Sequence, residues 1–107
     1  MRYRRGWAGR GRPPKPISLG RIPAQTSFIP TEIKNSTPIQ LYAPELEAMR
    51  LVDKQGYEQK DAGKKMGVSR GTVWRLLQSG RKKVITALTE SRPLVIVVKE
   101  GQLQEIQ

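Results

Sequence analysis

The stretch that decides the fold is residues 58–79, which read EQKDAGKKMGVSRGTVWRLLQS. A short helix is predicted over about 58–66, and Gly67 after it can take the positive φ of a tight turn. Ser69 is a favoured N-cap residue, so a further helix is predicted from Arg70. Two helices joined by so short a turn are typical of a helix-turn-helix, whose second helix enters the DNA major groove.

The helix that begins at Arg70 is expected to run to about Glu90. Its apolar residues recur at steps of three and four, which places them on one side of the cylinder, facing a core. Ala62 and Gly63 are small where the two helices would cross, and Val68 fills the angle between them. The residues predicted to face inward are Val73, Leu76, Leu77, Val84, Ala87 and Leu88.

Another helix is predicted upstream, beginning at Pro44, because proline suits the first turn of a helix. The Gln55-Gly56 pair is expected to end it. Two pairs of acids fall in first helical turns, where the helix dipole favours negative charge. We therefore assign a structural role, and not acid-base chemistry, to Glu45 with Glu47 and to Glu58 with Asp61.

The segments that flank the three helices are predicted to be extended. Residues 1–16 are rich in Arg, Gly and Pro and form a basic arm that is disordered on its own. Residues 17–43 are interrupted by prolines and form an extended segment that packs on the core. Residues 44–91 are the helix-turn-helix domain, and 92–107 are a C-terminal strand and tail. The fold class is mainly α, a three-helix core with a basic N-terminal arm and a short C-terminal strand.

The C-terminal strand is predicted at residues 94–98, LVIVV, because Arg92-Pro93 blocks further helix and the run is apolar and β-branched. So apolar a strand should not remain an exposed edge. It is expected to pair either with residues 17–33 or with its counterpart in a dimer. The apolar anchors expected in the preceding segment are Ile17, Leu19, Ile22, Phe28, Ile29 and Ile33.

Composition and charge limit the classes of function. The net charge is +11, with one basic block in residues 1–16 and another in 57–85, which points to a polyanion as partner. The chain has no His and no Cys, so we expect no enzyme activity, no metal and no cofactor. We find no membrane-length apolar run, no secretory signal and no evident small-molecule domain. A cytoplasmic, nucleoid-associated protein is therefore expected.

Four strings carry a resemblance to a known family: GRP at 11–13, FIP at 28–30, ELEAMRLVD at 45–53 and MGVSRGT at 66–72. Together they resemble uncharacterised protein family 0251, small prokaryotic proteins predicted to bind DNA. The string GVSRGTVWR at 67–75 is similar to the turn and recognition helix of lac-repressor-type regulators. The three predicted helices look like region 4 of sigma factors. These resemblances imply a sigma-region-4-like helix-turn-helix that binds DNA.

The chain departs from the family pattern at several positions. Glu58 and Asp61 replace a stronger helix cap, Gly63 replaces an alanine, Gly71 lies where a base-reading side chain is common, and Gly80 interrupts the long helix. Each interior glycine costs roughly 0.5–1 kcal/mol relative to alanine. An isolated domain of marginal stability is therefore predicted.

The residues expected to contact DNA through the recognition helix are Ser69, Arg70, Thr72, Trp74, Arg75 and Gln78. Arg70 and Arg75 suit either guanine edges or phosphates. Thr72 suits a thymine methyl, a phosphate or the backbone near the N-cap. Trp74 suits sugars or a base step, but also a core or a dimer surface.

Further cations are expected to bind phosphate, with a solvated helix face as the alternative for the last three: Lys64, Lys65, Arg81, Lys82 and Lys83. The arm string Arg10-Gly11-Arg12-Pro13 resembles an AT-hook, which lies in a narrow A·T minor groove. Such strings are also common in disordered tails. Tyr3 and Trp7 among the arginines would equally suit stacking on single-stranded RNA.

The function predicted from these observations is sequence-specific binding of double-stranded DNA and transcriptional regulation. A homodimer is considered because one short recognition helix gives limited specificity. Two alternatives are an RNA-associated or ribosome-associated basic protein, and a sigma-like module that binds another protein. The target sequence, the regulated genes and the direction of regulation are not predicted.

Overall fold

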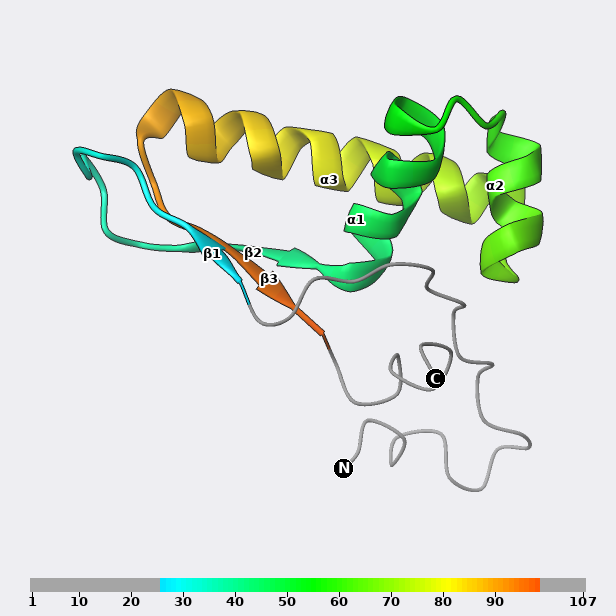
Figure 1. Cartoon of the computed structure of the whole chain (residues 1–107), viewed down its shortest axis with the longest axis horizontal. Helices are drawn as coiled ribbons and strands as arrows, with labels where there is room; N and C mark the ends of the chain where they lie inside the picture. Colours follow the sequence, from blue (N-terminus) through cyan, green and yellow to red (C-terminus); the bar gives the residue numbers. More distant parts are fainter. Residues whose placement is uncertain (1–25, 99–107) are drawn as a thin grey trace, which may run out of the picture.

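The structure is a computed structural model in which residues 26–98 are described (Figure 1). Its helical elements are α1 (Ala43–Met49), η2 (Arg50–Lys54), α2 (Gln59–Met66) and α3 (Arg70–Glu90). Its strands are β1 (Ser27–Phe28), β2 (Ile39–Tyr42) and β3 (Leu94–Val97). A mainly helical fold is therefore confirmed, and the strands form a sheet that the sequence did not predict in full.

The first helix begins directly after β2. The backbone N–H of Tyr42 donates to Oε1 of Glu45 at 2.9 Å, and Pro44 occupies the first turn as predicted. The chain then continues without a break as the π-helical turn η2, which the sequence did not predict. The helical run ends at Gln55, and Gly56 has a φ of 82°, as expected for a glycine after a helix.

Helices α2 and α3 lie close to their predicted bounds. Glu58 is the N-cap of α2 and its side chain makes no capping hydrogen bond, in agreement with the weak cap expected there. Helix α3 runs from Arg70 to Glu90, as predicted. It passes through Gly80 without interruption, and that glycine is buried. The glycine that departs from the family pattern at this position therefore does not end the helix.

The hydrophobic core lies where α1, η2, α2 and α3 meet. Val73 and Leu77 of α3 are fully buried in it, whereas Leu88 is 69% exposed, so its predicted inward position is wrong. The residues buried in this cluster are Ala48, Leu51, Ala62, Met66, Val73 and Leu77. Within residues 26–98, no helix has both the length and the apolar character that a bilayer crossing requires.

The sheet has the order β1-β3-β2. Strand β3 pairs antiparallel with β1, which confirms pairing with the 17–33 segment. It also pairs in parallel with β2, where Leu41 lies beside Ile96, and this neighbour was not predicted. Both of these side chains are buried, so the sheet closes the core beneath α3 (Figure 1).

Three of the expected apolar anchors do not anchor the segment that carries them. Phe28, Ile29 and Ile33 are 60%, 57% and 45% exposed. Their burial was predicted because apolar residues in an extended segment usually cover a core, but here the segment exposes them at the end of α3 (Figure 1). Ile17, Leu19 and Ile22 lie outside the described residues.

A buried ionic cluster fixes α1 to α3. Glu45 is 5% exposed, and its Oε1 accepts a hydrogen bond from Nζ of Lys83 at 2.8 Å. Its other oxygen accepts from the hydroxyl of Ser79. The Lys83 ammonium also lies 4.4 Å from the centre of the Tyr42 ring. Because the carboxylate is satisfied by these donors, the structural role assigned to Glu45 is supported.

A second acid of α1, Glu47, is 3% exposed and binds within its own helical run. Its two carboxylate oxygens accept from Nε and Nη2 of Arg50, both at 2.9 Å. This fork geometry is strong, and the hydrogen bond to Glu47 raises the pKa of the Arg50 guanidinium. Glu47 therefore stabilises the junction between α1 and η2.

Candidate nucleic-acid interface

The turn between α2 and α3 is tight because two glycines permit it. Gly67 adopts φ 74°, the left-handed conformation predicted for it. The N–H of Val68 donates to the carbonyl of Gly63 at 2.9 Å. A Cβ on Gly63 would lie 2.7 Å from the carbonyl oxygen of Val68, which is closer than atoms can approach. A side chain at 63 would therefore change the angle between the two helices.

The N-cap of α3 fixes where that helix starts. Oγ of Ser69 accepts from the backbone N–H of Thr72 at 3.1 Å, and the two hydroxyl oxygens are 3.0 Å apart. Thr72 is half-buried. Its hydroxyl and backbone thus take part in the cap, which is the structural alternative considered for this residue, and Ser69 is occupied in the same way.

The outer face of the first half of α3 is exposed and carries no acid. Val73 and Leu77 face the core and are fully buried, and Leu76 packs against that core, so Trp74 and Arg75 project away from it. Trp74 is 52% exposed, which excludes the core position considered for it. We call the exposed residues of this half the recognition face: Arg70, Gly71, Trp74, Arg75 and Gln78.

The cations further along α3 differ in whether an acid of the same chain already binds them. Arg81 donates to both oxygens of Asp53, at 3.1 and 2.7 Å, and these hydrogen bonds raise its pKa. Lys83 is occupied by Glu45. Lys82 is exposed and makes no ion pair among residues 26–98. The structure thus separates three neighbouring cations that the sequence grouped together.

Two more predicted cations lie in the last turn of α2. Lys64 and Lys65 are both exposed. The ammonium of Lys65 lies 5.5 Å from the centre of the Tyr57 ring, within the range of a cation–π interaction. Neither lysine makes an ion pair in the described part of the chain. Both remain available to an anion.

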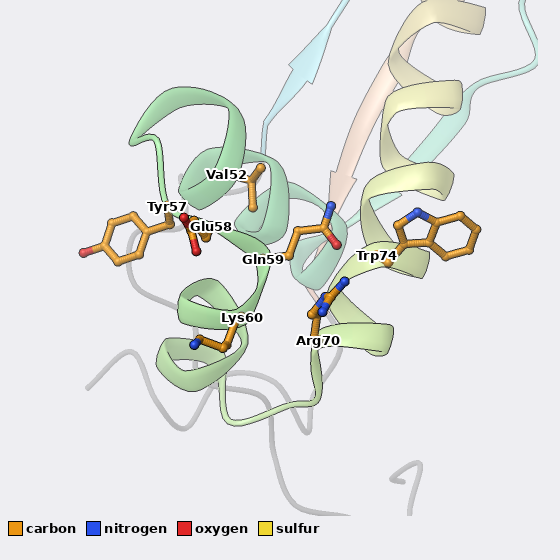
Figure 2. Close-up of a pocket in the computed structure, with 7 residues that line it drawn as sticks. All are labelled: Val52, Tyr57, Glu58, Gln59, Lys60, Arg70 and Trp74. Atoms are coloured by element: carbon orange, nitrogen blue, oxygen red, sulfur yellow. The ribbon is translucent and has the colours of Figure 1, made fainter.

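An open cleft of about 630 Å³ lies between the start of α2 and the start of α3. In Figure 2, Gln59 and Arg70 approach the same space beside Trp74, while Tyr57 and Lys60 border its far side. Sequence reasoning missed Gln59, Lys60 and Tyr57. The start of the first helix of a helix-turn-helix is a signal that would have found them, because it lies beside the start of the second.

The site residues predicted in the N-terminal arm lie outside the described residues. The arm residues Arg10, Gly11, Arg12 and Pro13 precede residue 26, where the description begins. Within residues 26–98, no three potential ligands among the acids come together in a way that would hold a metal ion.

Comparison with known proteins gives relatives along nearly the whole chain. A family model described as a protein of unknown function, DUF134, matches residues 3–106. A UPF0251 protein of Pyrococcus furiosus is 47% identical over 98 residues, covering 89% of this chain and 91% of the relative. One from Archaeoglobus fulgidus is 38% identical over 106 residues, covering 99% of each chain.

A UPF0251 protein of Thermococcus kodakarensis is 48% identical over 82 residues, covering 74% of this chain and 73% of the relative. No solved structure matches the chain. The relatives share a family name that states no activity. On the strength of the family model and of these identities, the chain belongs to the uncharacterised protein family 0251.

Proposed function

We propose that this protein binds double-stranded DNA sequence-specifically through a helix-turn-helix made by α2, the turn at 67–69 and α3, and that it acts as a transcriptional regulator. The observation that carries the proposal is the recognition face. It presents Arg70, Trp74, Arg75 and Gln78 on one helix, whose other side buries Val73 and Leu77 in the core. No acid occurs in α3 before Glu90.

The charges around the recognition face favour a polyanion. Arg70 and Arg75 make no ion pair within residues 26–98, unlike Arg81 and Lys83 further along the helix. A cation left without an internal partner is free to replace a counterion on a phosphate. The exposed cations that satisfy this condition near the face are Lys60, Lys64, Lys65, Arg70, Arg75 and Lys82.

The side chains divide by the chemistry that each offers. Arg75 and Gln78 lie mid-face, and both side chains can form paired hydrogen bonds with a base edge, to guanine and adenine respectively. Trp74 adds a large apolar surface next to Arg70, which suits a thymine methyl or the sugars of the groove wall. Lys60 and Gln59, across the cleft from Arg70, suit a phosphate of the same groove, and the exposed Glu58 is the one acid among the residues that line the cleft.

The experiment is a selection of bound duplexes from a random library, followed by salt titration of affinity on the selected sequence. If the six exposed cations each neutralise a phosphate, the slope of log K against log salt is about −5. Arg75→Ala should lower affinity about 10-fold or more and relax preference at a base position. Lys82→Ala should flatten the slope by about one and leave preference unchanged.

Lys34→Ala is the matched control, because Lys34 is an exposed lysine on the loop between β1 and β2. It should change neither slope nor preference. Two results would favour the alternatives. Preferential competition by structured RNA would support the RNA-associated protein. Activity that survives Arg70→Ala with Arg75→Ala would support a module that binds another protein.

A further inference from the structure

Large apolar side chains are exposed together at the end of the molecule opposite the recognition face. Five of the six exposed large hydrophobic residues within 26–98 belong to β1, the loop after it and the second half of α3. Trp74 is the sixth and lies on the recognition face. We call the group of five the apolar surface: Phe28, Ile29, Ile33, Ile85 and Leu88, each 45–69% exposed.

The members of the apolar surface adjoin one another. A hollow of about 180 Å³ is lined by Phe28, Ile29 and Leu88. Ile85 lies one helical turn before Leu88 on α3, so these two side chains are neighbours. Ile33 is held nearby because the N–H of Lys34 donates to the carbonyl of Ser91 at 3.1 Å. Figure 1 shows this loop beside the C-terminal end of α3.

The surface continues into a larger groove between α1, the sheet and α3. That groove measures about 490 Å³ and is lined mainly by apolar side chains. Phe28 and Leu94 line both the hollow and the groove, so the two form one surface. The other apolar residues that line the groove are Leu41, Leu46, Met49, Val84 and Ile96.

The exposed area is what a stable dimer requires. The exposed fractions of the five side chains amount to roughly 500 Å², taking about 150–200 Å² for each when fully accessible. A standard interface buries about 800 Å² on each partner, of which about 60% is apolar, or close to 500 Å². The largest apolar patch on a typical monomeric protein measures about 300–600 Å² and is often functional.

Charge favours a second copy of this chain on that surface. Two chains of +11 repel each other, so close approach is most favourable where the contact carries little unpaired positive charge. Arg92 lines the hollow but is paired with Glu90, and Arg50 lines the groove but is paired with Glu47, while Lys54 and Asp53 also line the groove. Residues 26–31 and 84–89 contain no charged residue, and these two stretches hold every member of the apolar surface except Ile33. We infer that the apolar surface is a self-association interface that forms a symmetric homodimer.

A consequence of this dimer rests on the proposed function. A symmetric dimer carries two recognition faces related by a two-fold axis, and the half-sites of a palindromic duplex are related in the same way. One dimer would therefore contact two half-sites.

The first experiment measures self-association of the full chain without DNA, by sedimentation equilibrium across micromolar concentrations. The wild type should dimerise, and Leu88→Glu should raise the dimer Kd at least 10-fold. Because Leu88 is already exposed, circular dichroism should show the variant folded. Gln40→Glu is the charge-matched control, since Gln40 is exposed on the sheet face opposite Phe28, and its Kd should match the wild type. A wild type that is monomeric throughout would overturn the inference, as would a Kd that Leu88→Glu leaves unchanged.

The second experiment separates this inference from the proposed function. Duplexes from the selection would carry two half-sites with centres about 10 or about 15 base pairs apart. Cooperative binding at the first spacing alone, abolished by Leu88→Glu, supports both proposals. Dimerisation in solution without any DNA binding refutes the proposed function and leaves the interface intact. DNA binding with no preference between the spacings, by a chain that stays monomeric, overturns the interface and leaves the function standing.

Discussion

Replacing Gly80 by alanine is expected to destabilise the fold, although the same replacement stabilises most helices. In the interior of a helix, alanine is favoured over glycine by about 0.8–1 kcal/mol. At Gly80, however, the new Cβ would lie 2.6 Å from Sδ of Met49, 3.2 Å from Cβ of Glu45 and 3.4 Å from its carbonyl oxygen. The sequence-based view that alanine would be better here therefore has to be revised.

The size of the destabilisation depends on whether the neighbours of Gly80 can move away from the new Cβ. The half-buried Met49 side chain can swing away at modest cost, but Glu45 is bound by Lys83, Ser79 and the N–H of Tyr42. Overpacking against fixed neighbours costs about 1–3 kcal/mol, which exceeds the gain in helix propensity. We expect Gly80→Ala to lower the free energy of unfolding by about 1 kcal/mol.

Gly71→Ala is the matched control, on the same helix and with the same change of residue. A Cβ at Gly71 meets only Oγ of Ser69, at 3.9 Å, so the propensity gain is retained. It should raise the free energy of unfolding by about 0.5–1 kcal/mol, and the two melting temperatures should move in opposite directions by several degrees.

The assay is urea unfolding followed by circular dichroism, at one protein concentration for all variants because self-association would add apparent stability. The slope of the free energy of unfolding against urea concentration should be equal in both variants and the wild type, because the surface area exposed on unfolding is unchanged. Stabilisation by Gly80→Ala equal to that by Gly71→Ala would show that α1 and α3 are not tightly packed at this point, and would refute the reasoning.

Three other predictions concern the turn, the buried cluster and the surface ion pair. Gly63→Ala should lower stability by about 1–3 kcal/mol in urea unfolding and weaken DNA binding beyond the loss of folded protein, because the turn must open. A variant that binds normally when folded would contradict this. Glu45→Ala should lower the free energy of unfolding by about 2–3 kcal/mol in the same assay, because it leaves Lys83 without its buried partner. A decrease below about 0.5 kcal/mol would contradict a stabilising role for this ionic cluster. Asp53→Asn should change the free energy of unfolding by at most about 1 kcal/mol. Because it releases Arg81, it should also make the slope of log affinity against log salt more negative by about one. An unchanged slope would show that Arg81 faces away from the phosphates.

The parts of the fold that could be predicted are those fixed by neighbouring residues. The bounds of α3 follow from the Ser69 cap and from the Arg92-Pro93 pair, both of which act within a few residues. The parallel pairing of β2 with β3 joins segments more than fifty residues apart, and β2 is only four residues long. No local pattern carries that pairing, so it was missed.

The candidate site was predicted unevenly for a similar reason. A charge run shows how many cations a helix carries but not which acids they meet. The partners of Arg81 and Lys83 lie 28 and 38 residues earlier in the chain. The hydrophobic periodicity of α3 likewise predicted that Leu88 faces the core, because an apolar residue at this spacing favours burial. It does not specify whether the covering surface belongs to the same chain.

Helix α3 connects the two proposals physically. Its first half carries the recognition face, its middle is clamped to α1 by Gly80 and the Glu45 cluster, and its last turns carry Ile85 and Leu88. Because a single helix of 21 residues joins the ends, the distance between two recognition faces in a dimer would be set by helix length and not by a flexible linker. The clamp then has a role beyond stability. A variant such as Glu45→Ala that frees α3 from α1 should blunt the preference for half-site spacing before it weakens binding to a single half-site.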